Sequence, residues 1–226
     1  MAQFERALEV VLKWEGGFSN NPADPGGATN LGITQETLRL WRGAPVGVED
    51  VRNLTLEEAR EIYRTLYWDV CRCAEMEWAA ALMVFDAAVN HGPRQAALFL
   101  QRVVDVEADG TIGPLTLAAT NANPETVAEE VGARRMAFYG ELANFGIFGF
   151  GWSRRLMNIL RVCVQPFTPE AEPVNAPEDA DPPDADPPDP DAPAPNVTIP
   201  YAPGRGPGRE PSEAAARWAF LKPPPS

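Results

Sequence analysis

The apolar positions at the start of the chain recur at the spacing of one helix face. Within residues 3–14 they fall at i, i+4, i+7 and i+8, at Phe4, Leu8, Val11 and Leu12. Gly16 and Gly17 follow directly, and glycine supplies the left-handed backbone conformation that ends many helices. The pattern predicts a first helix that places Glu15 at its C-terminal end, next to a glycine-rich loop.

Further helical patterns follow along the chain, without a run of alternating strand positions. We expect helices over 34–42, 55–70, 76–90, 94–104, 114–120, 124–143 and 152–164. Thr34 and Thr55 stand at N-cap positions, and the apolar stretch 76–90 is expected to be the most buried helix. Residues 19–31 carry turn residues throughout, which predicts a loop or a short irregular hairpin. The expected fold class is mostly α.

The chain changes character at Pro166. Most of its 24 prolines lie from this residue onward, where 11 acidic residues stand against four basic ones. Alternating Asp, Ala and Pro cannot bury apolar surface and favour an extended chain, so we expect a disordered acidic linker over 166–211. Residues 212–226 read as a short C-terminal helix and tail, which either docks on the same chain or binds a protein partner.

Charge and cysteine usage exclude several function classes. The net charge is −13 with no basic patch, which argues against nucleic-acid binding. The three cysteines, Cys71, Cys73 and Cys163, have neither zinc-ligand spacing nor an even count, so we expect free thiols. His91 is the only histidine, which makes a histidine metal cluster or a histidine-based triad hard to build.

The chain start also bears on where the protein acts. The first 17 residues lack a basic segment, a long apolar run and a cleavage site, so we expect no signal peptide. No stretch reaches the roughly 18 apolar residues of a membrane span. We therefore expect the protein to be synthesised in the cytoplasm, and we separately expect it to be a monomer.

Candidate chemistry gathers in the segment "WEGGFSNNPADPGGATNLGIT", residues 14–34. Glycoside cleavage requires a proton donor for the leaving oxygen and a second group that activates water or stabilises the cationic sugar. Glu15 suits the donor role. Asp24 and Thr29 are candidates for the second role, although Asp24 also suits a turn before Pro25 and the Thr29 hydroxyl also suits a hydrogen bond within its own loop.

The segment "EGGFSNNPADPGGATNLGIT" resembles the signature of the glycoside hydrolase family 108 muramidases, whose first helix ends in an EGG motif. Further blocks resemble the family in the same order: "LTLEEAREIYRTLYWD", "VFDAAVNHG", "LQRVVDVEADGTIGPLT" and "GWSRRL". The resemblance covers about residues 4–160. It implies a lysozyme-like fold and an N-acetylmuramidase with Glu15 as its catalytic glutamate. This enzyme cuts the β-1,4 bond between N-acetylmuramic acid and N-acetylglucosamine in peptidoglycan, chemistry that requires no cofactor or metal.

The catalytic spacing is also similar to the E-x8-D-x5-T pattern of phage lysozymes. Here it is E-x8-D-x4-T, one residue shorter before the threonine. We assign Glu15 as the proton donor, Asp24 as the second acid and Thr29 as an aid to the attacking water.

Four further residues are candidates for substrate contact: Tyr67, Trp68, Asn90 and Trp152. Aromatic faces form platforms for sugars, but an aromatic pair on one helix also suits core packing. The domain assignment is a lysozyme-like catalytic region over 1–91 and a helical region over 92–165 that completes it. The second region carries "DGTIGPLT", which resembles small peptidoglycan-binding domains: Asp109 and Gly110 would make a turn, and Pro114 would begin a helix.

The expected function is peptidoglycan hydrolysis, as an endolysin of a phage, prophage or gene-transfer agent that acts in the periplasm and depends on a holin for export. Three other functions stay open, and one of them is a chitinase- or chitosanase-like enzyme, which would differ in its substrate. A lytic transglycosylase needs one glutamate and forms an anhydro-sugar instead of adding water. A non-catalytic peptidoglycan-binding protein would use 92–165 for affinity and the tail to recruit a partner.

Overall fold

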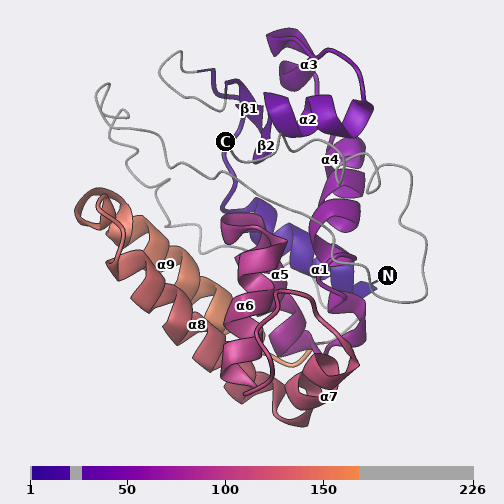
Figure 1. The fold of residues 1–226 in the computed structure, drawn as a ribbon. Coiled ribbons are helices and arrows are strands. Elements are labelled where there is room, and N and C mark those ends of the chain that lie inside the picture. Colours follow the sequence, from indigo (N-terminus) through magenta and orange to yellow (C-terminus); the bar gives the residue numbers. More distant parts are fainter. Residues whose placement is uncertain (1, 21–26, 168–226) are drawn as a thin grey trace, which may run out of the picture.

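The computed structural model describes residues 2–20 and 27–167, and it confirms a mostly α fold. One two-stranded antiparallel hairpin accompanies the helices (Figure 1). In chain order the elements are α1 Ala2–Leu12, β1 Thr29–Asn30, β2 Ile33–Thr34, α2 Gln35–Arg42, α3 Val48–Arg52, α4 Leu56–Tyr63, the π-helical turn η1 Arg64–Trp68, the 3₁₀ turn η2 Cys73–Glu75, α5 Trp78–His91, α6 Pro93–Val103, α7 Pro114–Ala122, α8 Pro124–Gly140 and α9 Phe145–Cys163. The predicted linker after Phe167 and the predicted C-terminal helix lie outside the described residues.

Helix α5 lies at the centre of the fold. Every residue from Trp78 to Ala88 is buried, which confirms the expectation from its continuous apolar sequence. Helices α1, α6, α8 and α9 all contact it. Figure 1 shows α8 and α9 side by side along one flank of α5, with α2, α3 and the hairpin at the far end of α4. The central helix is therefore the surface on which the other helices are positioned.

One hydrophobic core extends across the predicted boundary between 1–91 and 92–165. Its members come from elements on both sides of that boundary and include Phe4, Val11, Ile62, Phe85, Leu100, Val131 and Ile159. Because α5 contacts α6, α8 and α9 as well as α1, the two regions bury their apolar faces against each other. The second region completes the same core.

The sequence does not predict α3, and several helix ends differ from the expectation, most clearly in α1 and α9. Helix α1 ends at Leu12, two residues early, and neither Gly16 nor Gly17 has a positive φ, so the predicted glycine cap is wrong. Helix α9 begins at Phe145 and not at residue 152. Its glycine-rich first turns are held by aromatic packing, since the rings of Phe148 and Trp152 lie 5.8 Å apart.

Two local predictions hold in detail. The Oγ atom of Thr34 accepts a hydrogen bond from the amide of Thr37 and caps α2. Gly110 adopts a φ of +82°, its amide donates to Gln101 Oε1, and Pro114 begins α7. The "DGTIGPLT" segment is thus a turn fastened to α6.

The ring of Phe85 connects the central helix with the elements around Glu15. It is fully buried, and its centroid lies 5.3 Å from that of Trp68 and 6.0 Å from that of Phe4, both edge to face. We expect Phe85→Ala to lower the free energy of unfolding by about 3–5 kcal/mol, because it removes a buried ring and leaves a cavity. Urea denaturation measures this loss. Phe85→Leu, which leaves a smaller cavity, should cost less, and equal losses for both variants would contradict the packing argument.

Candidate active site

Glu15 lies in the turn that follows α1. The turn continues the helix with hydrogen bonds between residues three apart in place of four. The amide of Trp14 donates to Val11 O at 2.9 Å, and that of Glu15 donates to Leu12 O at 3.2 Å. The Glu15 side chain is 16% exposed. A carboxyl group in this position is largely withdrawn from water but still open on one side.

Helix α9 anchors this turn at two points. Arg155 Nη1 lies 2.9 Å from Glu15 Oε1 in an ion pair. One helical turn further along α9, Asn158 Oδ1 accepts a hydrogen bond of 3.3 Å from the indole of Trp14. Residues three apart on a helix share a face, so α9 holds two consecutive residues of the turn with one face.

Asp86 of α5 holds Arg155 in place from the interior. Its Oδ1 accepts hydrogen bonds from Arg155 Nε at 3.0 Å and Nη2 at 2.8 Å, while its Oδ2 accepts one of 2.7 Å from Arg135 of α8. Burial by itself raises the pKa of Asp86, but the charges of Arg155 and Arg135 outweigh it and hold that pKa below its usual value. Together with Glu15, two acids and two arginines form a charge-balanced group.

The turn between β1 and β2 faces Glu15 from the opposite side. Its two residues, Leu31 and Gly32, both have positive φ, +49° and +71°, as a two-residue type I′ hairpin requires. This conformation is unusual for leucine, and Tyr63 of α4 fixes it by donating a hydrogen bond of 2.9 Å to Leu31 O. A Cβ atom on Gly32 would lie 2.5 Å from Tyr63 Oη and 2.6 Å from Glu15 Oε2. The carboxyl group therefore lies against the bare backbone of this turn.

The tyrosines behind the carboxyl group stay protonated. Burial and the nearby charge of Glu15 raise the pKa of Tyr63 well above its usual value, and the same two causes raise the pKa of Tyr67. Tyr63 therefore acts as a neutral hydrogen-bond donor to the hairpin and not as a base.

Comparisons with known proteins show which family the chain belongs to. The sequence model of the family described as Glycosyl hydrolase 108 matches residues 8–92, and that of a family described as Predicted Peptidoglycan domain matches residues 95–157. A solved structure titled "Structure of Brucella abortus SagA" is 37% identical, with a TM-score of 0.66 over 71% of this chain and 92% of that chain. The chain belongs to the glycosyl hydrolase 108 family. A search of curated proteins finds no match.

Membership in glycosyl hydrolase 108 makes the protein a glycoside hydrolase of the lysozyme type. Together with the match to the peptidoglycan domain, it supports peptidoglycan as the polymer that the chain binds and hydrolyses. Glu15, Gly32, Tyr63 and Asp86 fall within the stretch that matches the hydrolase. Arg155 falls within the stretch that matches the peptidoglycan domain.

The structure places Thr29 in the strand that closes the loop after Glu15. Its amide and carbonyl exchange hydrogen bonds of 2.8 Å with Ser19, and its partner in the hairpin is Thr34. Ser19 and Thr29 thus pair with each other on either side of the segment that includes Asp24. Asp24 itself lies outside the described residues. Its role as the second acid, and the part of Thr29 in positioning water, stay predictions.

The four predicted contact residues have different surroundings. Trp68 is 2% exposed and packs edge to face on Phe4, and Tyr67 is 6% exposed, so burial favours the core-packing alternative for both. Asn90 donates its side-chain amide to Asp86 O at 2.9 Å. Trp152 is half-buried and stacks on Tyr139 with the ring centroids 5.0 Å apart. Their contact with a glycan stays a prediction.

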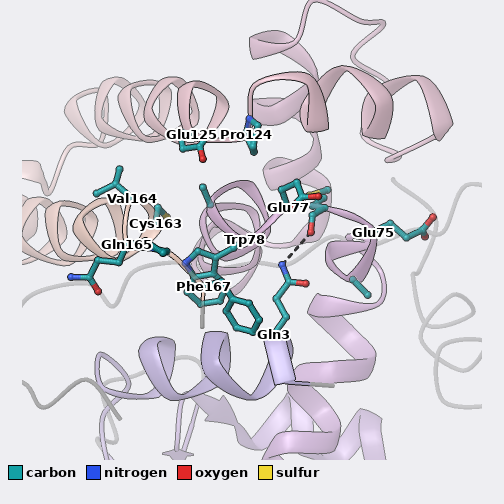
Figure 2. A pocket seen from close by; sticks show the side chains of 14 residues that line it. Gln3, Glu75, Glu77, Trp78, Pro124, Glu125, Cys163, Val164, Gln165 and Phe167 are labelled. Atoms are coloured by element: carbon teal, nitrogen blue, oxygen red, sulfur yellow. Dashed lines mark hydrogen bonds between the residues drawn. The ribbon is translucent and has the colours of Figure 1, made fainter. Parts of the chain in front are cut away.

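A pocket of about 700 Å³ opens elsewhere, where α9 ends (Figure 2). The rings of Trp78 and Phe167 pack against each other in it at a tilt, with their centroids 5.1 Å apart, and no predicted site residue lines it. Within the described ranges, no group of His, Cys, Asp and Glu side chains could hold a metal ion. In that same part of the chain, no helix is long and apolar enough to cross a membrane.

Sequence reasoning did not find two residues that shape the site. Gly32 lies one residue beyond the loop or hairpin expected over 19–31, yet the signal for its role is present, because a glycine in the second position of a two-residue turn indicates a type I′ hairpin. Arg155 was noted within "GWSRRL", but its pairing with Glu15 joins distant segments. No local pattern could have indicated it.

Gly32→Ala tests the close approach of the hairpin to the carboxyl group. The new methyl group would collide with Glu15 Oε2 and Tyr63 Oη, and we expect a loss of about 10²-fold in peptidoglycan hydrolysis because small displacements of a reacting group are that costly. Turbidity loss of purified cell walls gives the rate. Gly113→Ala, far along the chain at the start of α7, is the control, since its Cβ would meet nothing within 4 Å and its backbone is extended. Equal rates for the two variants would contradict the placement.

His91 provides a second test, through pH. Burial and the charge of Arg135 lower the pKa of His91 to about 3. The unfolded chain takes up a proton near pH 6.5, so the stability that neutral His91 provides is present above that pH and is lost as the pH falls towards 3. We expect unfolding to cost about 1–2 kcal/mol less at pH 5 than at pH 6.5.

Urea denaturation at both pH values measures this change, and His91→Gln should remove most of it. As the chain has one histidine, its imidazole signal can also be followed by NMR in the folded protein. A titration of that signal between pH 5 and 7.5 would contradict the neutral, buried state.

Proposed function

We propose that this glycosyl hydrolase 108 chain is an N-acetylmuramidase, which hydrolyses the β-1,4 bond between N-acetylmuramic acid and N-acetylglucosamine in peptidoglycan. The observation that carries the proposal is the Glu15 carboxyl group: it is largely buried, Arg155 binds one of its oxygens, and the other lies against the Leu31–Gly32 turn. A single carboxyl group in a partly desolvated, fixed position suits a general acid.

In the proposed mechanism the proton moves from Glu15 Oε2 to the glycosidic oxygen while the bond from that oxygen to the anomeric carbon breaks. A water molecule adds to the anomeric carbon and leaves its own proton with the enzyme. Asp24 is our candidate for the second acid, with Thr29 orienting the water. Asp86 does not suit this role, because arginines occupy both of its oxygens.

We further propose a biological role as an endolysin of a phage, prophage or gene-transfer agent. The enzyme would be made in the cytoplasm, pass the inner membrane with the help of a holin and reach its substrate in the periplasm. A protein partner for residues 212–226 belongs to the same proposal. What supports the role is the substrate, since peptidoglycan lies outside the membrane that encloses the site of synthesis.

Glu15→Gln tests the chemistry. We expect the wild-type protein to release fragments from purified peptidoglycan with muramic acid at the reducing end, and the variant to release at least about 10³-fold less, because amide nitrogen cannot supply the proton. Mass spectrometry of the fragments identifies the ends. Glu9→Gln on the exposed side of α1 is the control and should leave the rate unchanged.

The same spectra separate the alternatives. Anhydro-muramic ends would replace the proposal with a lytic transglycosylase and remove the need for Asp24. Fragments with N-acetylglucosamine at the reducing end would identify a glucosaminidase. Binding to the cell wall without any fragments, from wild-type protein, would favour the non-catalytic reading.

A further inference from the structure

The cation that contacts Glu15 comes from the part of the chain that matches a peptidoglycan domain. Arg155 belongs to α9, while Glu15 belongs to the stretch that matches the hydrolase. The match that contains Arg155 is named for peptidoglycan and not for hydrolysis. The ion pair of 2.9 Å between the two residues shows that this stretch also reaches the reacting carboxyl group.

Arg155 is held by the interior independently of Glu15. Two of its nitrogens donate to Asp86 Oδ1 at 3.0 and 2.8 Å, and Asp86 is bound on its other oxygen by Arg135. Only the third nitrogen, Nη1, reaches Glu15. A planar guanidinium with two nitrogens fixed has no freedom to follow a moving carboxyl group, so the direction of Nη1 is set before substrate arrives.

This arrangement decides which oxygen of Glu15 can carry a proton. A guanidinium group has donors and no acceptor, and Nη1 already points a donor at Oε1. A proton on Oε1 would face that donor, so the protonated acid carries its hydrogen on Oε2, the oxygen beside Gly32. After the proton leaves, the carboxylate remains next to a fixed positive charge, which stabilises the product of the transfer.

We propose that Arg155 is a positioning residue of the catalytic centre: it selects Oε2 of Glu15 as the donating oxygen and stabilises the carboxylate left behind. The stretch named for peptidoglycan binding therefore completes the active site. The proposal rests on the proposed function, because it assigns Arg155 a part in the proton transfer from Glu15.

The test compares two buried arginines that share Asp86. Arg155→Met removes the cation from Glu15 and leaves Asp86 paired with Arg135. Arg135→Met removes the other partner of Asp86 and makes no contact with Glu15 in the ion pairs and hydrogen bonds of the described residues. Both changes disturb the same buried acid, so both should lower the unfolding midpoint, but only the first should affect the chemistry.

The assay uses soluble peptidoglycan fragments and the full chain. We expect Arg155→Met to lower kcat by about 10²-fold. KM should change by less than about threefold, which is a small change in binding free energy. Binding to insoluble cell walls should match the wild type. Arg135→Met should keep kcat within about threefold of the wild-type value, a small change in free energy. A kcat loss shared equally by both variants would mean that Arg155 acts through stability alone and would overturn the proposal.

Lysine variants keep the test decisive if a methionine variant fails to fold. Arg155→Lys retains the charge but cannot bind Asp86 and Glu15 together with a planar fork, so kcat should fall by about tenfold and lie between the wild type and Arg155→Met. Arg135→Lys should leave kcat unchanged. Wild-type kcat in Arg155→Lys and Arg155→Met alongside an inactive Glu15→Gln would refute the role of Arg155 and leave the muramidase proposal standing. An inactive wild-type protein would refute both.

Discussion

The buried pairing of Asp86 with two arginines holds the helices behind the site together, and one of the two, Arg155, reaches Glu15 itself. A carboxylate with no exposed surface is tolerated only when charged donors surround it, and here α8 and α9 each supply one. The pairing therefore fixes the position of α8 and α9 along α5, and the face that each helix turns towards it. Any other packing of α9 would leave Asp86 half-satisfied, and the end of α1 would lose its contact with a cation.

Glu15 is consequently held between two rigid supports from different parts of the molecule. On one side stands α9 with a bound guanidinium group. On the other stands a hairpin turn whose leucine adopts a left-handed conformation and whose shape is retained by a tyrosine hydroxyl. Strained backbone persists only where neighbouring contacts over-determine it. The turn of Leu31 and Gly32 meets that condition, which is consistent with a site built for a fixed geometry.

The sequence indicated the parts of this architecture that local physics decides. Helical period placed the core helices, threonine positions marked the start of α2, and a glycine-flanked acid marked the turn that follows α1. Where the chain departed from expectation, a distant contact was responsible: aromatic packing carries α9 through glycines that would otherwise interrupt a helix, and Trp68 is buried by Phe4 and Phe85. The pairing of Arg155 with Glu15 is of the same kind, since it joins residues that only the completed fold brings together.

The anchoring of the α1 turn by α9 also orders events in time. Trp14 and Asn158 are 144 positions apart in sequence. The turn after α1 leaves the ribosome early, but its contacts with α9 can form only after that last helix has been synthesised. Contacts of such long range close late because the intervening chain must first be ordered. A nascent or truncated chain that lacks α9 would carry the glutamate without its cation, and hydrolytic capacity would arrive only when the whole domain has been made.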